Sequence, residues 1–385
     1  MRLLSVLTYY DPHWTGLTAY AQRLAEGLAR RGHEVTVLTS RHSPDLAPAE
    51  QRNGVRVVRL PILTRLSRGV VMPTFPMAAW QLIKSHDIVQ FHTPILEAWL
   101  ITALARLARK KALMTHHGDL VMPSGLLNRI VERAVTWMMV RGGKSAARVS
   151  VYTRDYAAHS RFLERFGSAL VYIYPPIEIP RPDLAAMSAW KREIGLDGAC
   201  VIGFAGRFVE EKGFDFLLKA LPILKDRVPN VKLVFAGETN IVYERFYDRW
   251  KRLVEQNRAH IVMLGLILDR QRLAQFHAMC DVLALPSRTD ALAAVQVEAM
   301  LCGTPVVAAD IPGAREAVKV TGMGRLVRPR DPEALAEGLI EVIRDRPRFV
   351  KDHDTVRAIF DPERSVTEYE TLLETLVTGP PCVNR

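Results

Sequence analysis

The chain has 385 residues, and its hydrophobic fraction of 49% and charged fraction of 24% are those of a globular protein, long enough for two domains. Four dispersed cysteines without a Cys-x-x-Cys pair exclude a disulfide or metal framework and favour a reducing compartment. No segment reaches the roughly 18 apolar residues of a membrane span, and the N-terminus does not resemble a signal peptide. We therefore expect a cytoplasmic protein.

The formal net charge of +11 is concentrated in the N-terminal half of the sequence. Residues 1–176 contain 23 Lys and Arg against 11 Asp and Glu, whereas the remaining residues contain 29 against 30. A basic half indicates an anionic partner such as phospholipid headgroups or a phosphorylated substrate, unless it is only a solvated basic surface. Because no nucleic-acid recognition module is visible, we expect no nucleic-acid partner.

In the first half, short apolar segments alternate with helical patterns. An apolar strand over 3–10 precedes a loop and a helix from about Ala19 to Arg31, which Gly32 ends. Further strands are predicted at 33–40, 54–60, 87–92, 111–117, 147–153 and 170–175. Alternation of strands and helices predicts a parallel, doubly wound α/β sheet.

The proline-rich segment 173–183 has no helical periodicity and is interpreted as a linker. The second half then repeats the alternation and ends in a helix over 332–344 and an amphipathic helix from 361. Its strands are predicted at 201–207, 232–238, 260–265, 281–287, 305–310 and 324–329. Two α/β halves joined by a linker predict a cleft, which is a common place for a ligand.

The loop after the strand 201–207 combines a glycine with two cations. Gly206 allows close backbone approach, and Arg207 and Lys212 lie at a strand-to-helix turn whose free N–H groups also favour an anion. A diphosphate needs this combination of a guanidinium fork, a point charge and free amides. The alternative is that both cations are exposed and pair with Glu210 and Glu211.

Two further loops follow strands of the second half. Gly237 ends the strand 232–238, and PSRTDALAAVQVEAM (286–300) carries Asp290 in a loop and Glu298 in the following helix. Ligands of open parallel sheets bind where loops leave the carboxyl ends of the strands. The alternative is an ordinary surface acid and an ordinary helix acid.

These motifs resemble the large retaining glycosyltransferases of family 4, and the resemblance covers nearly the whole chain. The family pattern G-R-x-x-x-x-K-G-x-D-x-L-L-x-A is matched by Gly206, Arg207, Lys212, Gly213, Asp215, Leu217, Leu218 and Ala220. The pattern P-S-x-x-E-G-F-G-x-x-x-x-E-A-M-A-x-G-x-P-V-V-A is matched by Pro286, Ser287, Asp290, Glu298, Ala299, Met300, Gly303 and Pro305 to Ala308. In the first half, the segments 9–39, DIVQFHTP and THHGD also match.

The resemblance implies a GT-B fold, an α/β architecture of two Rossmann-like domains whose parallel sheets face across a cleft. It implies an acceptor-binding domain over 1–175, a donor-binding domain over 176–360, and a C-terminal helix and tail over 361–385 that crosses back to the first domain. The implied activity moves a hexose from a nucleotide-diphosphate sugar to a lipid-linked or polysaccharide acceptor, with retention of configuration. No metal or other cofactor is expected, and a UDP-sugar is slightly favoured over a GDP-sugar.

The resemblance also implies roles for individual residues. Arg207 and Lys212 would hold the donor diphosphate, Glu298 the ribose hydroxyls, and Asp290 would lie near the donor sugar. His117 would contact the transferred sugar, with His116 as the alternative. The implied catalytic residues are thus His117, Asp290, Arg207 and Lys212, and the implied donor-binding residues are Gly16, Gly206, Arg207, Lys212, Gly237, Asp290, Ala291, Leu292, Ala293 and Glu298.

The sequence departs from the family pattern at the acid loop. Asp290 replaces the usual Glu, which shortens its reach by roughly 1.3 Å, and Ala291-Leu292-Ala293 replaces Gly-Phe-Gly. Near the N-terminus, Thr15-Gly16 replaces Gly-Gly. The sequence favours an active transferase with an altered sugar pocket. A catalytically silent relative that binds a nucleotide sugar or acts as a subunit, and a sugar-phosphate phosphorylase or epimerase, remain alternatives.

Two segments of the first half mix basic and apolar residues, 60–84 with Arg65 and Arg68, and 120–144 with Arg129 and Arg133. Such segments suit docking at an anionic membrane surface. The alternative is that the apolar residues belong to the core. We therefore expect peripheral contact with the inner face of the membrane.

Overall fold

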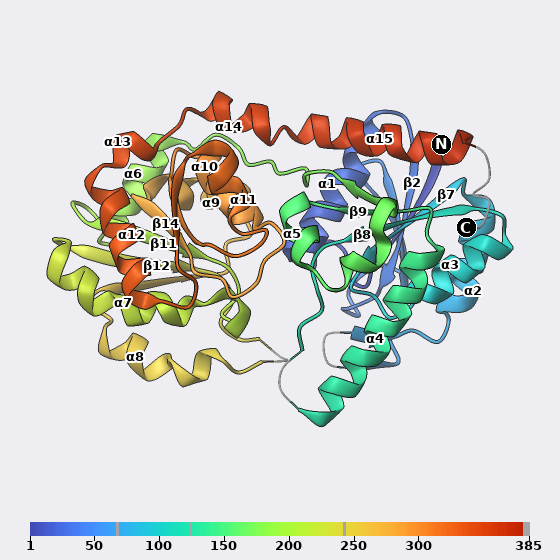
Figure 1. Cartoon of the computed structure of the whole chain (residues 1–385), viewed down its shortest axis with the longest axis horizontal. Coiled ribbons are helices and arrows are strands. Elements are labelled where there is room, and N and C mark those ends of the chain that lie inside the picture. The colour runs from blue at the N-terminus through green and yellow to red at the C-terminus, as the bar shows by residue number, and fades with distance from the viewer. Residues whose placement is uncertain (67–68, 123–124, 242–243, 380–385) are drawn as a thin grey trace. The chain divides into compact units, whose positions relative to one another are not determined.

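The computed structural model describes residues 1–66, 69–122, 125–241 and 244–379. The chain divides into two compact units (Figure 1). The first unit consists of Met1–Pro176 and the C-terminal segment from Pro362, and the second of Ile177–Asp361. The chain thus leaves the first unit in the proline-rich segment and returns to it for its last helix. Arg68, which the sequence analysis names, lies outside the described residues, as does the tail beyond Gly379 with one of the four cysteines, Cys382.

The first unit contains an eight-stranded sheet in the order β10-β9-β8-β7-β1-β2-β4-β3. All neighbouring strands are parallel except β3, which is antiparallel to β4. The strands are β1 (Arg2–Val6), β2 (Glu34–Ser40), β3 (Ala49–Arg52), β4 (Val55–Leu60), β7 (Ile88–Thr93), β8 (Lys111–His116), β9 (Arg148–Val151) and β10 (Leu170–Tyr172). A separate hairpin is formed by β5 (Thr64–Leu66) and β6 (Gly69–Val71). All six residues of β7 are buried, because helices cover both faces of a parallel sheet.

The helices of the first unit are α1 (Gly16–Arg30), α2 (Phe75–Ser85), α3 (Ala98–Leu107), α4 (Leu126–Ser145), α5 (Arg154–His159), the 3-10 turn η1 (Leu163–Ala169) and α15 (Pro362–Thr378). Helix α1 begins three residues before the predicted Ala19, because Thr15 and Thr18 form a capping box. The predicted strand 3–10 ends at Val6, and residues 7–15 form the loop that leads into α1.

The second unit contains a six-stranded, fully parallel sheet in the order β13-β12-β11-β14-β15-β16. The strands are β11 (Cys200–Ala205), β12 (Val231–Ala236), β13 (Ile261–Gly265), β14 (Val282–Leu285), β15 (Val306–Ala309) and β16 (Gly324–Val327). Counted within the unit, this is the Rossmann order 3-2-1-4-5-6, which reverses direction between β11 and β14. Ligands of such sheets bind at the reversal, beyond the carboxyl ends of these two strands.

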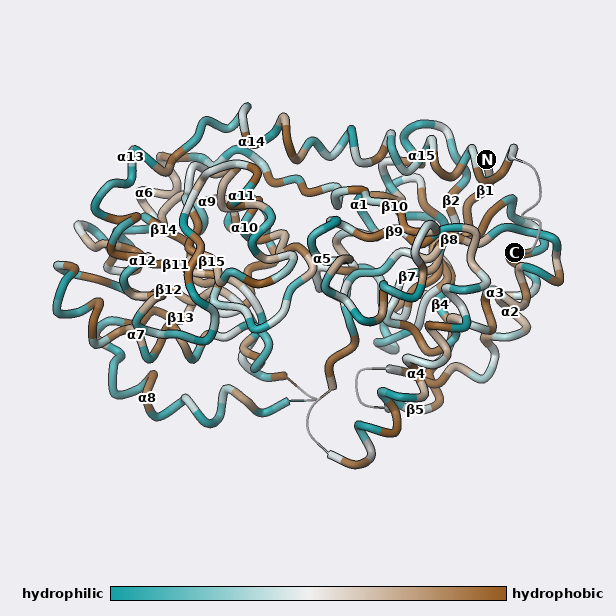
Figure 2. Tube along the Cα trace, viewed as in Figure 1, coloured by the Kyte–Doolittle hydropathy of each residue, from teal (hydrophilic) through white to brown (hydrophobic). Residues whose placement is uncertain are grey.

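The helices of the second unit are α6 (Leu184–Glu193), η2 (Glu210–Lys212), α7 (Phe214–Arg227), η3 (Tyr247–Arg249), α8 (Lys251–Gln256), α9 (Arg270–Met279), α10 (Ala294–Leu301), α11 (Glu316–Thr321), α12 (Pro332–Arg344), α13 (Arg346–Phe349) and α14 (His353–Ile359). Hydrophobic residues concentrate along the strands of each unit (Figure 2). In the second unit, Phe204, Phe208, Phe214 and Phe235 pack together between the sheet and α7. This aromatic core supports the loop that follows β11.

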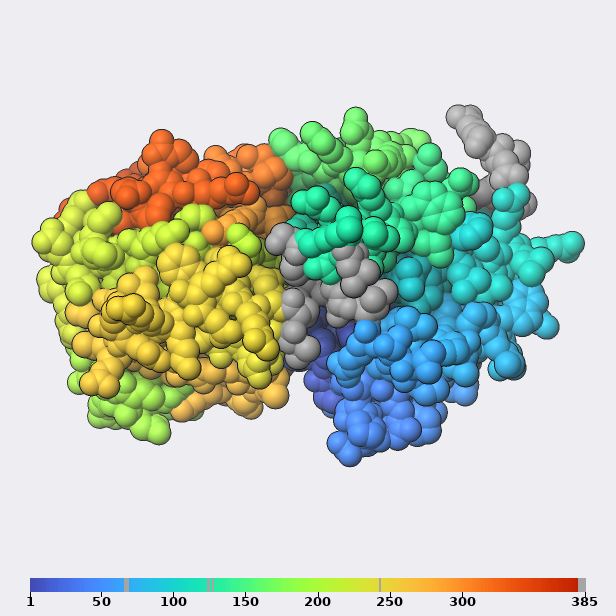
Figure 3. Space-filling model, turned by 90° about the horizontal axis from the view of Figure 1, so that it is seen from below, coloured from blue at the N-terminus to red at the C-terminus, as the bar shows by residue number. Residues whose placement is uncertain are grey.

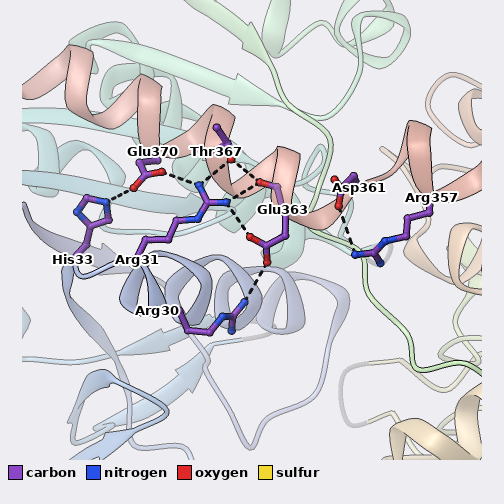
Figure 4. Close-up of polar contacts among 8 residues, drawn as sticks. All are labelled: Arg30, Arg31, His33, Arg357, Asp361, Glu363, Thr367 and Glu370. Atoms are coloured by element: carbon purple, nitrogen blue, oxygen red, sulfur yellow. Dashed lines mark hydrogen bonds and ion pairs between the residues drawn. The ribbon is translucent and has the colours of Figure 1, made fainter. Parts of the chain in front are cut away.

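Helix α15 packs on α1 within the first unit (Figure 4). The packing is close, since a Cβ at Gly27 would lie 2.8 Å from Cγ2 of Val366. Around this contact, Arg31 pairs with Glu363 at 2.9 Å and with Glu370 at 2.7 Å, and Nε2 of His33 lies 2.7 Å from Glu370. We call these four residues the α1–α15 clamp.

None of the described helices combines the length and the apolar composition that crossing a bilayer requires.

Candidate functional site

The loops after β11 and β14 meet at the reversal of the second sheet. Gly213, with φ of 68°, ends η2, and a Cβ at this position would overlap the carbonyl oxygen of Pro286. The backbone N–H of Arg288 donates to the carbonyl of Glu211 at 2.7 Å. The phosphate loop (residues 206–213) and the acid loop (residues 286–293) are therefore in direct backbone contact.

Lys212 lies between the two loops. Its Nζ is 2.7 Å from Oδ2 of Asp290, which also lies 3.4 Å from the Ser287 hydroxyl. Burial lowers the pKa of Lys212, but the attraction of Asp290 and Glu211 outweighs it, so that the net pKa is raised above its ordinary value. Lys212 therefore stays charged near neutral pH. The alternative pairing of Lys212 with Glu210 or Glu211 is replaced by this pairing across the loops.

Arg207 lies at the carboxyl end of β11, and its guanidinium pairs with Glu211 at 3.0 Å. This is one of the pairings that the sequence offers as an alternative to phosphate binding. The two cations of the phosphate loop thus each contact a carboxylate, Glu211 and Asp290, on the loops that flank the reversal. A diphosphate carries the same kind of charge as these carboxylates and is therefore able to exchange with them.

The glycines predicted for the donor site also lie at this edge of the sheet. Gly206 and Gly237 follow β11 and β12, and a Cβ on Gly237 would overlap the carbonyl oxygen of Gly206. The N–H of Gly206 donates to Ala236 at 2.9 Å. The two loops therefore approach backbone to backbone, which only glycine allows.

The remaining residues of the acid loop are buried. Ala291, Leu292 and Ala293 precede α10, and Glu298 lies in that helix with a side chain that is almost fully buried. Burial lowers the pKa of the neighbouring His277 to about 4, with the charge of Glu298 acting in the opposite direction. The structure thus brings Gly206, Arg207, Lys212, Gly237 and Asp290 to the loops at one edge of the sheet, with Glu298 on the next helix.

Gly16 and His117 belong to the first unit. Gly16 is the exposed first residue of α1, and a Cβ there would contact nothing within 4 Å. Nε2 of His117 lies 2.9 Å from Nδ1 of His92, and its Nδ1 contacts the Tyr152 hydroxyl. Burial lowers the pKa of both histidines, that of His92 to about 3, so that both imidazoles are neutral.

His116, the alternative to His117, is fully buried. Its Nδ1 lies 2.9 Å from the Thr93 hydroxyl, and its Nε2 lies 3.0 Å from Asp119. The ring nitrogens of both histidines are thus in contact with other side chains of the first unit. A sugar hydroxyl would reach either ring only by replacing one of these partners.

Two site residues were not predicted from the sequence. Arg288 of the acid loop forms a two-pronged ion pair with Asp215, with oxygen–nitrogen distances of 2.8 and 2.9 Å. Asp215 is part of the motif G-R-x-x-x-x-K-G-x-D, but the motif does not indicate its partner. The two residues are 73 positions apart, and no sequence pattern at that spacing predicts that they form a pair.

Among the described residues, one group of side chains has the geometry to hold a metal ion, formed by His33, Glu370 and Glu374. Arg31 already pairs with Glu370 there, and the N-terminal ammonium lies 3.3 Å from Nδ1 of His33. These positive charges oppose a cation, and we propose no metal site.

A Rossmann-order sheet with cationic loops at its reversal is typical of domains that bind the phosphates of a nucleotide. Residues 15–175 match the model of the glycosyl transferase 4-like domain, and residues 187–357 match that of the glycosyl transferases group 1. The chain belongs to the retaining glycosyltransferases of family 4. The predicted family is thereby confirmed.

One similar protein is the GDP-mannose-dependent alpha-(1-6)-phosphatidylinositol monomannoside mannosyltransferase of Mycobacterium tuberculosis, 30% identical over 368 residues that cover 91% of both chains. Another is the D-inositol 3-phosphate glycosyltransferase of Xylanimonas cellulosilytica, 28% identical over 86% of this chain and 84% of the relative.

The fold resembles that of the sucrose-phosphate synthase of Thermosynechococcus elongatus, with a TM-score of 0.79, 20% identity and coverage of 98% of this chain and 100% of the other. The HepE protein of Anabaena, solved with UDP and glucose, has a TM-score of 0.80, 20% identity and coverage of 97% and 100%. These likenesses confirm the predicted GT-B fold.

Proposed function

We propose that the protein transfers a mannosyl residue from GDP-mannose to an anionic, lipid-linked acceptor, with retention of configuration. The observation that carries the proposal is the convergence of Arg207 and Lys212 at the loops beside the reversal of a Rossmann-order sheet. The sequence alone slightly favours a UDP-sugar. We now favour GDP-mannose, because the name of a relative that is 30% identical states dependence on it.

The donor diphosphate would replace the two carboxylates as the partner of both cations. Glycosyl transfer builds negative charge on the leaving phosphate, and a fixed guanidinium and ammonium stabilise that charge without a metal ion. Asp290, released from Lys212, would then accept hydrogen bonds from hydroxyls of the donor sugar. Glu298 would bind the ribose hydroxyls, and the leaving phosphate would assist attack from the same face of the sugar.

The acceptor side of the proposal rests on helices α3 and α4 of the first unit. Trp99 and Trp137 are 43% and 49% exposed, and their rings are 5.7 Å apart. Arg141 lies 5.2 Å from the Trp137 ring, and α4 also carries Arg129 and Arg133. Exposed tryptophans flanked by arginines suit the interface of an anionic membrane. The face of α4 that Figure 3 shows in teal is open to solvent.

The alternative assignment of the apolar residues to the core fits the other basic segment better. Val70, Met72 and Phe75 of the segment 60–84 are buried, and its tryptophan, Trp80, is half-buried, although Leu63 and Met77 are exposed. Among the described side chains of α4, by contrast, the exposed large apolar ones include the tryptophan Trp137, together with Leu126 and Ile130. We therefore place the membrane contact on α3 and α4 rather than on residues 60–84.

The donor assignment is tested by thermal unfolding with GDP-mannose, UDP-glucose and ADP-glucose. A ligand that binds only the folded state raises the melting temperature by mass action. We expect a rise with GDP-mannose that the variant Arg207→Ala/Lys212→Ala does not show. A rise with UDP-glucose alone would mean that UDP-glucose, not GDP-mannose, is the donor. No rise with any of the three would favour the silent relative that acts as a subunit, with Asp290, Ala291 and Ala293 as the causes.

The membrane assignment is tested by flotation with vesicles that contain anionic phospholipid. We expect the parent to float, and Trp99→Ala/Trp137→Ala and Arg129→Glu/Arg133→Glu to remain at the bottom. Leu266→Ala/Leu268→Ala is the matched control, because these apolar side chains are equally exposed but lie in the second unit. Absence of flotation by the parent would contradict this part of the proposal.

A further inference from the structure

Arg288 lies in the acid loop, two residues before Asp290, and joins that loop to helix α7. Both prongs of its guanidinium bind the carboxylate of Asp215, whose side chain is only 1% exposed. The guanidinium carbon also lies 4.2 Å from the centre of the Phe216 ring. A planar fork that is bonded on one edge and stacked on one face has little freedom to rotate.

The same residue also holds the backbone of η2. Its Nη1 donates to the carbonyl of Glu210 at 2.6 Å, and its own backbone N–H donates to the carbonyl of Glu211 at 2.7 Å. Lys212 is the next residue of η2. Arg288 therefore contacts the two residues that precede Lys212, Glu210 and Glu211. It also contacts the first turn of α7, the helix that follows Lys212.

Stability alone gives a weak reason for this arrangement. Removing a carboxylate such as that of Asp215 from water is costly, and a buried ion pair is often no more stable than apolar residues of the same volume. What the pair provides is a fixed geometry between the acid loop and the start of α7, which follows the phosphate loop. In that geometry the ammonium of Lys212 lies 2.7 Å from Asp290.

We propose that Arg288, acting through Asp215, is a positioning residue that sets Lys212 for the terminal phosphate of the bound nucleoside diphosphate. The inference rests on the proposed function of this site as the donor site. Arg288 itself need not touch the donor. Its loss lets Lys212 leave the place of the terminal phosphate, while the base, the ribose and the first phosphate keep their contacts.

The test measures the affinity of the full-length protein for GDP and for GMP by calorimetry. The ratio of the two affinities reports the contacts to the terminal phosphate and cancels general damage to the nucleotide site. We expect Arg288→Ala and Arg288→Lys to lower this ratio about tenfold, the equivalent of one charged hydrogen bond. Lysine retains the charge but has no fork, and so it does not restore the ratio.

Arg325→Ala is the matched control, because Arg325 forms an exposed pair with Glu341 in the same unit, and its ratio should equal that of the parent. Should Arg288→Ala fail to melt cooperatively, Arg288→Lys and Asp215→Asn carry the test, since both keep the volume of the site. A parental ratio in folded variants would overturn the role of Arg288 and leave the proposed function intact. A parent that binds GDP no better than GMP, and UDP and ADP no better than their monophosphates, would overturn both.

Discussion

Glu97 is a single carboxylate in an unusual place. It follows β7, and the strand order of the first sheet reverses between β7 and β1, so Glu97 lies at the reversal of that sheet. Burial raises the pKa of Glu97 to about 7, opposed by the hydrogen bond of its own backbone.

The raised pKa predicts a pH dependence of stability. Between the ordinary value of 4.5 and about 7, the folded protein keeps a proton on Glu97 that the unfolded chain has released. The contribution of this group therefore favours folding at low pH and is lost as the pH rises through 7. We expect Glu97→Gln to melt at a higher temperature than the parent at pH 8, with a smaller difference at pH 5.

The control for this prediction is Glu34→Gln, a change at an exposed residue at the start of β2. If the difference in melting temperature between the parent and Glu97→Gln were the same at every pH, the pKa of Glu97 would not be raised in the folded protein.

At the residue scale, the sequence predicts which residue types reach the site but not the partners of their side chains. The motif places Lys212 after β11. Its pairing with Asp290, 78 residues later, depends on β11 and β14 being neighbours in the sheet. The contacts of His117 with His92 and Tyr152 arise in the same way, from neighbouring strands. The roles of these residues in catalysis stay predictions.

Among the structural elements, the end of η2 gives a sharp test of the contact between the loops. Gly213 and Gly195 both have positive φ, 68° and 71°, but a Cβ on Gly195 would meet nothing within 4 Å. Both alanine variants should lose about 1–2 kcal/mol from the positive φ. Only Gly213→Ala should also push the acid loop away and abolish the thermal shift with the donor. If the donor raised the melting temperature of both variants equally, the contact between the loops would have no role in donor binding.

The α1–α15 clamp predicts a second pair of variants. Arg31 binds Glu363, Thr367 and Glu370 and is 26% exposed in its side chain, whereas Arg30 is 62% exposed and reaches Glu363 only at 3.6 Å. We expect Arg31→Ala to lower the free energy of unfolding by about 1–2 kcal/mol, and Arg30→Ala by about 0.5 kcal/mol or less. Urea denaturation measures both. Equal effects would mean that the clamp adds nothing beyond surface charge.

The strands that the sequence analysis does not predict are those with weak sequence patterns. The edge strand β3 has the sequence AEQR, which is polar and largely exposed, and its pairing with β4 leaves no alternation to detect. The three-residue strands of the hairpin β5–β6 are too short for any period. The parallel strands of both sheets, by contrast, are mostly short apolar runs, and the sequence predicts each of them within a few residues.

At the scale of the whole molecule, the second unit is one continuous segment with its own hydrophobic core. We therefore expect residues 177–361, produced alone, to fold cooperatively and to retain part of the affinity for GDP. Calorimetry and near-ultraviolet circular dichroism measure this. A fragment that stays unfolded would mean that the core of the second unit is insufficient without the rest of the chain.

The first unit, by contrast, is discontinuous, because it takes its last helix from the C-terminal end of the chain. On the ribosome, its sheet is complete when Tyr172 has emerged, but α15 emerges about two hundred residues later, at roughly 5–20 residues per second. During those tens of seconds α1 lacks its contact with α15, including that of Gly27 with Val366. The unit encoded second is thus able to finish folding first, and the first unit is completed only after α15 has emerged.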